Sequence, residues 1–229
     1  MSGNCEARQR ASRNSGKISK SLAMGKDLWI YEKNAMDQGY VRIAGVDEAG
    51  RGPLAGPVVS AAVILPEFIA ISREVDSKKL THGKRETLYQ TIYENAVSIG
   101  IGIVDHREID RVNILNASLL SMAMAVENLC PQPDYLIIDG IFQIQYGLPQ
   151  RPVPKGDSLS MSIGCASIIA KVTRDRLMER HHQDDPRYGF NRHKGYPTRE
   201  HKAAIAEHGC SFIHRKSFKG VKEYEHFLS

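Results

Sequence analysis

Two adjacent acids at the end of an apolar run constrain this chain more than any other feature. Asp47 and Glu48 follow the β-rich run 41–46, and a loop rich in glycine and proline comes directly after them. Burying two carboxylates together is costly unless a cation or hydrogen-bond donors compensate for them. Strand ends beside loops are also common places for functional side chains. The pair therefore indicates a functional site, although two exposed acids that open a turn would give the same pattern.

The loop after the acids carries Gly50, Arg51 and Gly52, which invites a comparison with dinucleotide-binding loops. A GxGxxG loop must lead into a helix, whereas here two prolines and a second β-rich run, 58–65, follow. The two runs therefore predict a hairpin with an elaborate loop. Its glycines would let backbone amides approach a ligand closely, and Arg51 would supply a phosphate or sugar contact. Glycines needed only for a tight loop would look the same.

Two further acids are candidates for the same site. Asp139 closes a short apolar strand, and Asp157 precedes a long helical pattern that continues to about residue 182. Each has an ordinary alternative, because Asp-Gly is a common turn and either Asp157 or Ser158 is a good N-cap for that helix. Carboxylate oxygens suit hard cations such as Mg²⁺ or Mn²⁺ rather than zinc. Two such ions could activate water and stabilise a leaving oxygen in phosphodiester cleavage.

The order of the predicted elements indicates an α/β domain with a mixed sheet. Besides the two early β runs, strands are predicted over 98–104 and 135–138, with an edge strand near Val153. Apolar periodicity and stop signals predict the helices, which are 26–40, 83–96, 107–129, the long one ending near 182, and 198–208.

The charge of the chain is unevenly distributed. The net charge of the 229 residues is +5, but residues 1–20 and 171–229 are basic while residues 21–170 are acidic. Basic ends around an acidic middle would suit a polyanion held over cation-binding carboxylates. Ordinary solvated surface charge would give the same distribution. The segment 1–25, rich in serine and arginine, is expected to be a disordered basic tail.

Composition favours a reduced, cytoplasmic protein without a membrane span. No run approaches the roughly 18 apolar residues that a spanning helix needs, and no apolar leader segment is visible. The four cysteines lie far apart and form no CxxC pair. This spacing argues against a zinc ribbon and against a dense disulfide framework.

These segments resemble bacterial ribonuclease HII, the type 2 ribonuclease H. The resemblance spans about residues 41–220, and its most specific part is AGVDEAGRGPLAGPVV at residues 44–59. The other matching segments, in order, are DSKKL, LIIDG, KGDS, ASIIAKVTRD, YGF, HKGYPT and HRKSF. Arg51 between the glycines favours type 2 over type 3, where a lysine stands at that place. The extension 1–40 and the cysteine at position 165 depart from the family pattern.

The resemblance implies an RNase H-like fold, a mixed five-stranded sheet flanked by helices, with a small C-terminal helical region. Residues 26–185 would form the catalytic core and residues 186–229 the substrate-binding region. The implied enzyme is an endonuclease with a two-metal-ion mechanism that uses Mn²⁺ or Mg²⁺. It would cleave the RNA strand of RNA–DNA hybrids and incise 5′ of single ribonucleotides in duplex DNA, leaving 3′-hydroxyl and 5′-phosphate ends. Its role would be ribonucleotide removal during DNA replication and repair.

The resemblance also implies roles for individual residues. The catalytic, metal-binding acids would be Asp47, Glu48, Asp139 and Asp157. The residues that contact substrate would be Gly50, Arg51 and Gly52 at the ribose 2′-hydroxyl, Tyr196 against the next sugar, and Lys78 at a phosphate. The implied protein is a monomer, and a contact with a replication clamp is left open.

Two other hypotheses compete with this one. A non-catalytic protein that binds RNA–DNA hybrids could share the fold, and metal-dependent cleavage would separate the two. An RNase H-like nuclease with another substrate, such as a resolvase, would not require a ribonucleotide.

Overall fold

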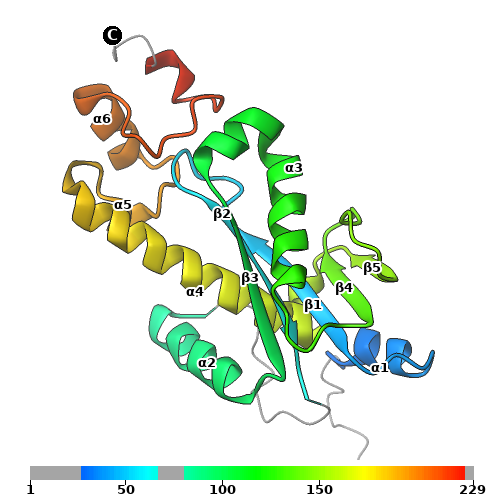
Figure 1. The fold of residues 1–229 in the computed structure, drawn as a ribbon. Coiled ribbons are helices and arrows are strands. Elements are labelled where there is room, and N and C mark those ends of the chain that lie inside the picture. Colours follow the sequence, from blue (N-terminus) through cyan, green and yellow to red (C-terminus); the bar gives the residue numbers. More distant parts are fainter. Residues whose placement is uncertain (1–26, 67–79, 225–229) are drawn as a thin grey trace, which may run out of the picture.

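A five-stranded mixed sheet lies at the centre of the computed structural model, which describes residues 27–66 and 80–224 (Figure 1). The strands are β1 (Ile43–Ala49), β2 (Val58–Ile64), β3 (Ser98–Val104), β4 (Tyr135–Asp139) and β5 (Gln150–Val153). Their order across the sheet is β3-β2-β1-β4-β5. The pairs β1–β2 and β2–β3 are antiparallel, whereas β1–β4 and β4–β5 are parallel. The predicted α/β class and the predicted hairpin are confirmed.

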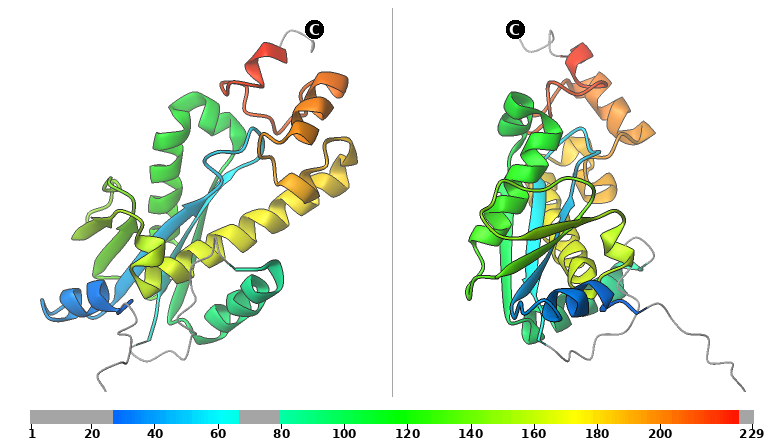
Figure 2. Two further views of the ribbon diagram at one scale, coloured as in Figure 1. Left: turned by 180° about the vertical axis from the view of Figure 1, so that it is seen from behind. Right: turned by 90° about the vertical axis from the view of Figure 1, so that its right-hand side faces the viewer.

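Helices cover both faces of the sheet (Figure 2). They are α1 (Ile30–Met36), α2 (His82–Asn95), α3 (His106–Glu127), α4 (Met161–Asp184), α5 (Phe190–His193) and α6 (Arg199–His208). α3 packs on one face around Ala62 and Ile138, and α4 and α2 pack on the other around Ala61 and Val63. The two faces therefore hold separate apolar cores. Among the described helices, none combines the length and the apolar character that crossing a bilayer demands.

Strand glycines set how closely the long helices approach the sheet. A Cβ atom at Gly45 would lie 2.2 Å from the backbone carbon of Ser162 in α4. A Cβ atom at Gly102 would lie 1.9 Å from the carbonyl oxygen of Ser121 in α3. Both contacts are far inside van der Waals distance, so any side chain at either position would push its helix away. The first contact holds α4 against the strand that carries the acidic pair.

The start of α4 differs from the prediction. Neither Asp157 nor Ser158 caps it, because Ser160 takes that position and its hydroxyl accepts the amide of Ile163. Residues Gly156–Ser158 form a separate 3₁₀ turn. Several suitable cap residues stand close together in this stretch, and the local sequence alone does not choose among them. Asp157 therefore lies before the helix, in a turn of its own.

Two other predicted boundaries also shift. The first helix covers only Ile30–Met36 of the predicted 26–40. The first strand runs to Ala49 rather than ending at residue 46, so the acidic pair lies within β1. The final helix has its predicted ends, with Thr198 as N-cap and Gly209 following it with a positive φ of 73°.

The C-terminal region packs against the loop between β1 and β2. Leu54 of that loop shares an apolar cluster with Ile205 and Val221, and Ala55 shares another with Tyr188 and Phe190. The loop therefore forms part of the core of the C-terminal region. The domain division at residues 185 and 186 stays a prediction, and the predicted tail 1–25 lies outside the described residues.

Candidate active site

The acidic pair occupies the last part of β1. Consecutive strand residues point to opposite faces of a sheet, and the two carboxylates follow this rule. Asp47 is 4% exposed and accepts hydrogen bonds from the amide of Glu48 at 2.7 Å and from the hydroxyl of Ser167 on α4. Glu48 instead lines a cavity together with Ser118 and Met122 of α3. The pair thus presents carboxylates toward both covering helices.

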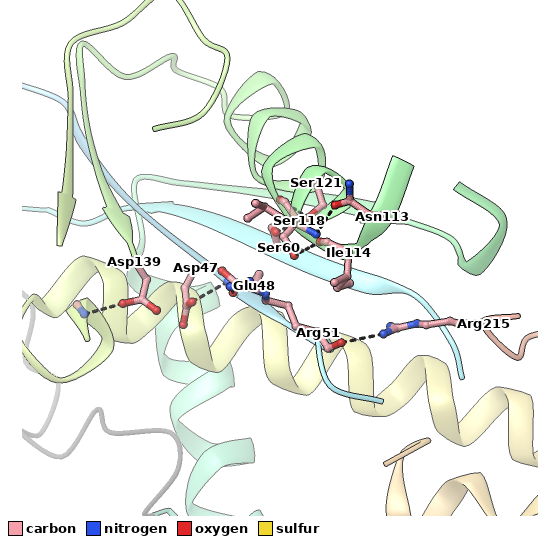
Figure 3. A network of polar contacts seen from close by, with 12 residues as sticks. Asp47, Glu48, Arg51, Ser60, Asn113, Ile114, Ser118, Ser121, Asp139 and Arg215 are labelled. Carbon is pink, nitrogen blue, oxygen red and sulfur yellow. Dashed lines mark hydrogen bonds and ion pairs between the residues drawn. The ribbon is translucent and has the colours of Figure 1, made fainter. Parts of the chain in front are cut away.

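Asp139 ends β4, the parallel neighbour of β1. Its Oδ1 atom accepts the amide of Gly156 at 2.6 Å, which ties the 3₁₀ turn to the strand end. Asp157 follows that glycine and is buried. Figure 3 shows Asp139, Asp47 and Glu48 side by side along the ends of the two strands. The structure thus brings three of the predicted acids together and places Asp157 in the adjoining turn.

Burial and neighbouring charges raise the pKa values of two of the three carboxylates. Burial raises the pKa of Asp47 well above its usual range, and the charges of Glu48 and Asp139 raise this pKa further. Burial also raises the pKa of Glu48, although the guanidinium of Arg51, 3.3 Å away, opposes the shift. Acids crowded in this way favour protonation or a bound cation. Clusters of this kind are typical of functional sites.

A cavity of about 290 Å³ opens beside these acids. Glu48, Arg51 and Asp139 contribute to its charged side. The rest of its wall is largely apolar and includes Leu115, Leu119, Met122, Ile141, Phe142 and Pro154. A cavity lined by both carboxylates and apolar side chains suits a cation-bound phosphate with its attached sugar.

The donor set suits a hard divalent cation. Within residues 27–66 and 80–224, no three His, Cys, Asp or Glu side chains are arranged so that they could together hold a metal ion. Mg²⁺ in phosphoryl-transfer sites commonly takes only one or two carboxylates and completes its shell with water and substrate phosphate. The mutually repelling Asp47, Glu48 and Asp139 provide such a partial set.

The predicted glycine loop lies directly after the acids. Gly50 has a positive φ of 102°, which favours glycine. No described residue accepts a hydrogen bond from the amide of Arg51 or of Gly52. The ring of Tyr196 lies beside the loop, since its Cε1 atom is 3.6 Å from the place of a Cβ atom on Gly52. The structure therefore brings the predicted loop and Tyr196 together, with Tyr196 partly exposed.

Sequence reasoning missed three residues that support the site. Ser167 binds Asp47, and two buried arginines, Arg174 and Arg215, bind the glycine loop. Arg174 lies in the matching segment ASIIAKVTRD and Arg215 in the matching segment HRKSF. Nothing in either segment distinguishes a buried arginine from an exposed one. Lys78, the predicted phosphate contact, lies outside the described residues.

Comparison with known proteins identifies the family. The family model described as Ribonuclease HII matches residues 44–221. Ribonuclease HII of Geobacter metallireducens is 55% identical over 199 residues, which cover 87% of this chain and 93% of the relative.

Solved structures agree with the fold. The ribonuclease H2 of Pyrococcus horikoshii OT3 superposes with a TM-score of 0.67 at 26% identity, covering 82% of this chain and 98% of that one. Bst-RNase HIII in complex with Mn²⁺ superposes with a TM-score of 0.63 at 19% identity, covering 82% of this chain and 70% of that one.

These matches extend over nearly the whole described region, from the acidic pair to the residues that follow α6. They agree with the predicted RNase H-like fold. The chain belongs to the ribonuclease HII family, whose members are hydrolytic, divalent-metal-dependent endonucleases acting on RNA–DNA hybrids.

Proposed function

We propose that this protein, besides cleaving the RNA strand of hybrids, incises duplex DNA on the 5′ side of a single embedded ribonucleotide. The products would carry 3′-hydroxyl and 5′-phosphate ends. The observation that carries the proposal is the placement of the amides of Arg51 and Gly52, which lack a protein acceptor among the described residues and lie just after the acidic pair. A ribose hydroxyl can accept from such amides, and a deoxyribose offers no hydroxyl there.

We assign cation binding to Asp47, Glu48, Asp139 and Asp157. A bound Mg²⁺ or Mn²⁺ supplies charge stabilisation for the phosphate and lowers the pKa of an attacking water. The protein contributes a buried, hydrogen-bonded frame for these acids, because Ser167 and Gly156 each donate to one of them. Carboxylates whose oxygens are held in this way lose little further freedom when a cation binds.

Arg51 has a second role in this proposal. In the free protein its guanidinium pairs with Glu48 at 3.3 Å and partly neutralises the acid cluster. Its side chain is half exposed, so it would be able to exchange this partner for a phosphate or a sugar if Glu48 held a cation. The same side chain then serves as counter-ion in the free protein and as substrate contact in the complex.

Substrate recognition would combine the loop with an aromatic platform. Tyr196 lies against Gly52 and is 42% exposed, so its ring is accessible for a contact with the next sugar. Contacts to the sugar hydroxyl and to the sugar ring do not depend on the base. We therefore expect little preference for base sequence.

The proposals for oligomeric state, location and cellular role are those made from the sequence. We propose a monomer that acts in the cytoplasm in ribonucleotide removal during replication and repair. A contact with a replication clamp and the phosphate contact by Lys78 stay predictions.

An end-labelled duplex with one embedded ribonucleotide tests the proposed incision. With Mg²⁺ or Mn²⁺ we expect a single cut 5′ to the ribonucleotide and no cut in an all-DNA duplex of the same sequence. Binding without cleavage in either ion would favour a non-catalytic hybrid-binding protein. Cleavage of both duplexes would favour a nuclease, such as a resolvase, that does not require a ribonucleotide.

A further inference from the structure

Two almost fully buried arginines hold the loop between β1 and β2. Arg174 comes from α4 and Arg215 from the segment after α6, and their side chains are 1% and 0% exposed. In the part of the chain that the structure describes, neither forms an ion pair with a carboxylate, and the hydrogen bonds of their guanidinium groups go to backbone carbonyls. Burying a guanidinium is costly without partners of this kind.

Arg215 binds carbonyls along the whole loop. Its Nη2 atom donates to Gly50 at 2.6 Å, and its Nη1 atom donates to Arg51 at 3.1 Å. Further bonds reach the carbonyls of Pro53 at 2.8 Å and Gly56 at 2.9 Å. One planar side chain thus fixes the orientation of four peptide groups.

The first two of these bonds determine where the neighbouring amides point. In a planar trans peptide, the carbonyl of one residue and the amide of the next point in opposite directions. The Gly50 carbonyl turned toward Arg215 therefore sends the Arg51 amide away from the protein interior. The Arg51 carbonyl does the same for the Gly52 amide. These are the two amides that find no acceptor in the described parts of the chain.

Arg174 connects the loop to the segment that carries the tyrosine. It donates to the carbonyls of Ala55 at 3.1 Å and Pro57 at 2.9 Å, and also to that of Lys194 at 2.9 Å. Lys194 stands two residues before Tyr196 in the turn after α5. One side chain therefore sets the distance between the loop and the aromatic ring.

Both arginines remain charged at neutral pH. Burial lowers the pKa of Arg174 to about 10 and that of Arg215 to about 9, and in the latter the charge of Arg174 contributes. Two positive charges therefore lie beneath the loop, where they also favour an approaching polyanion.

We propose that Arg215 is a positioning residue for ribonucleotide discrimination, which it controls by turning the Arg51 and Gly52 amides toward the substrate without touching it. Arg174 fixes the position of the same loop relative to Tyr196. This inference rests on the proposed function, because it explains how the same loop recognises a ribose. Loss of either guanidinium should therefore weaken discrimination between ribose and deoxyribose more than it weakens binding to DNA.

The test measures the affinity of each variant for a duplex with one ribonucleotide and for the matching all-DNA duplex, with Ca²⁺ in place of the catalytic cation. For Arg215→Lys we expect the ratio of the two affinities to fall about tenfold, while affinity for DNA changes less than about twofold. A lysine lacks the planar fork that reaches four carbonyls. Global destabilisation would instead lower both affinities in proportion. The matched control is Arg187→Lys, because Arg187 is an exposed arginine that pairs with Asp185.

A folded Arg215→Lys variant with an unchanged ratio would overturn the proposal. If that variant does not fold, the same ratio of affinities is measured for Arg174→Lys. Its control is Arg176→Lys on the same helix, because Arg176 is half exposed and pairs with Glu86. Unfolding of both buried variants would also contradict the proposal, since anchoring would then be inseparable from folding.

A substrate-independent measurement separates this inference from the proposed function. The amides of Leu54 and Gly56 donate to the carbonyls of Gly195 and Ile213, so their hydrogen exchange reports on loop order. We expect exchange at these amides to be at least about tenfold faster in Arg215→Lys, with the core strands unchanged. If the wild-type protein did not discriminate between ribose and deoxyribose, the proposed function would be contradicted. If hydrogen exchange at the Leu54 and Gly56 amides were unchanged in Arg215→Lys, the role of Arg215 in holding the loop would be contradicted.

Discussion

Asp139 is the residue on which catalysis should depend most directly. An asparagine would keep an oxygen for the Gly156 amide, so the strand end should stay intact. The asparagine side chain would, however, lack the negative charge that binds a divalent cation. We expect Asp139→Asn to lower turnover by at least about 100-fold, with affinity for a ribonucleotide-containing duplex changed by less than about threefold. Single-turnover cleavage and fluorescence anisotropy measure the two quantities.

The control for this variant is Asp134→Asn. Asp134 accepts the exposed amides of Val41 and Arg42 just before the strands begin, away from the acid cluster. Its substitution should leave turnover within about twofold. Near-normal turnover in Asp139→Asn would remove that residue from the proposed cation site.

Asp47 should make the cation-free protein less stable at neutral pH. Its pKa is raised in the folded state, so between the unfolded and folded pKa values the folded protein binds more protons than the unfolded chain. Stability from this group is therefore lost as pH rises through the folded pKa. We expect Asp47→Asn to raise Tm by about 2–4 °C at pH 7 without divalent ions, while abolishing activity. Calorimetry at pH 5 and pH 7 measures this, with a smaller difference expected at pH 5.

Added Mn²⁺ provides the complementary measurement. It should raise the Tm of the wild-type protein, because a bound cation relieves the repulsion among the acids. The same addition should shift the Tm of Asp47→Asn much less. An equal shift in both proteins would mean that the stabilising cation binds elsewhere.

At the scale of elements, α1 has a structural role that could not be predicted from the sequence. Its Glu32 is buried, and the Oε1 atom accepts the hydroxyls of Ser160 and Ser162 and the amide of Ser162. A carboxylate at the start of α4 also interacts well with the helix dipole. The short N-terminal helix thus anchors the start of the helix that supports the acids.

We expect Glu32→Ala to lower the free energy of unfolding by about 1–3 kcal/mol, because it leaves buried donors without their acceptor. Urea unfolding measures this cost. Glu94→Ala is the matched control, since Glu94 is an exposed residue of α2, and it should change stability by less than about 0.5 kcal/mol. Equal effects of the two substitutions would contradict an anchoring role for α1.

Local sequence predicted most elements because periodicity and stop signals are local properties. The strand 98–104 and the final helix, which ends at His208 as predicted, agree with their predictions. The 3₁₀ turn before α4 could not be predicted, because Asp139 holds Gly156 across a gap of 17 residues. The candidate acids could be selected from the sequence because carboxylates directly after an apolar run are unusual, and their role stays a prediction. The buried arginines were not identifiable, since their burial depends on how the C-terminal region packs on the loop.

At the scale of the whole molecule, α4 joins the two parts of the site (Figure 1). Ser167 binds Asp47, Arg174 binds the glycine loop, and Met178 packs in the cluster that the C-terminal region forms with that loop. These positions are seven and four residues apart, so they lie along one face of the helix. A continuous helix therefore fixes the acids relative to the loop that would recognise the sugar. This arrangement explains how cleavage would be confined to the phosphate beside a ribonucleotide.

Recognition of the ribose 2′-hydroxyl is tested most directly by the incision rates of three duplexes that differ only at the 2′ position of one sugar. The sugars are a ribose, a deoxyribose, and a 2′-fluoro sugar that keeps a ribose-like pucker without the hydroxyl. We predict a 5′ cut at the ribose in Mg²⁺ or Mn²⁺, with rates at least about 100-fold lower for both other sugars. Comparable cutting at the 2′-fluoro sugar would contradict this prediction, because recognition would then depend on sugar shape and not on the hydroxyl.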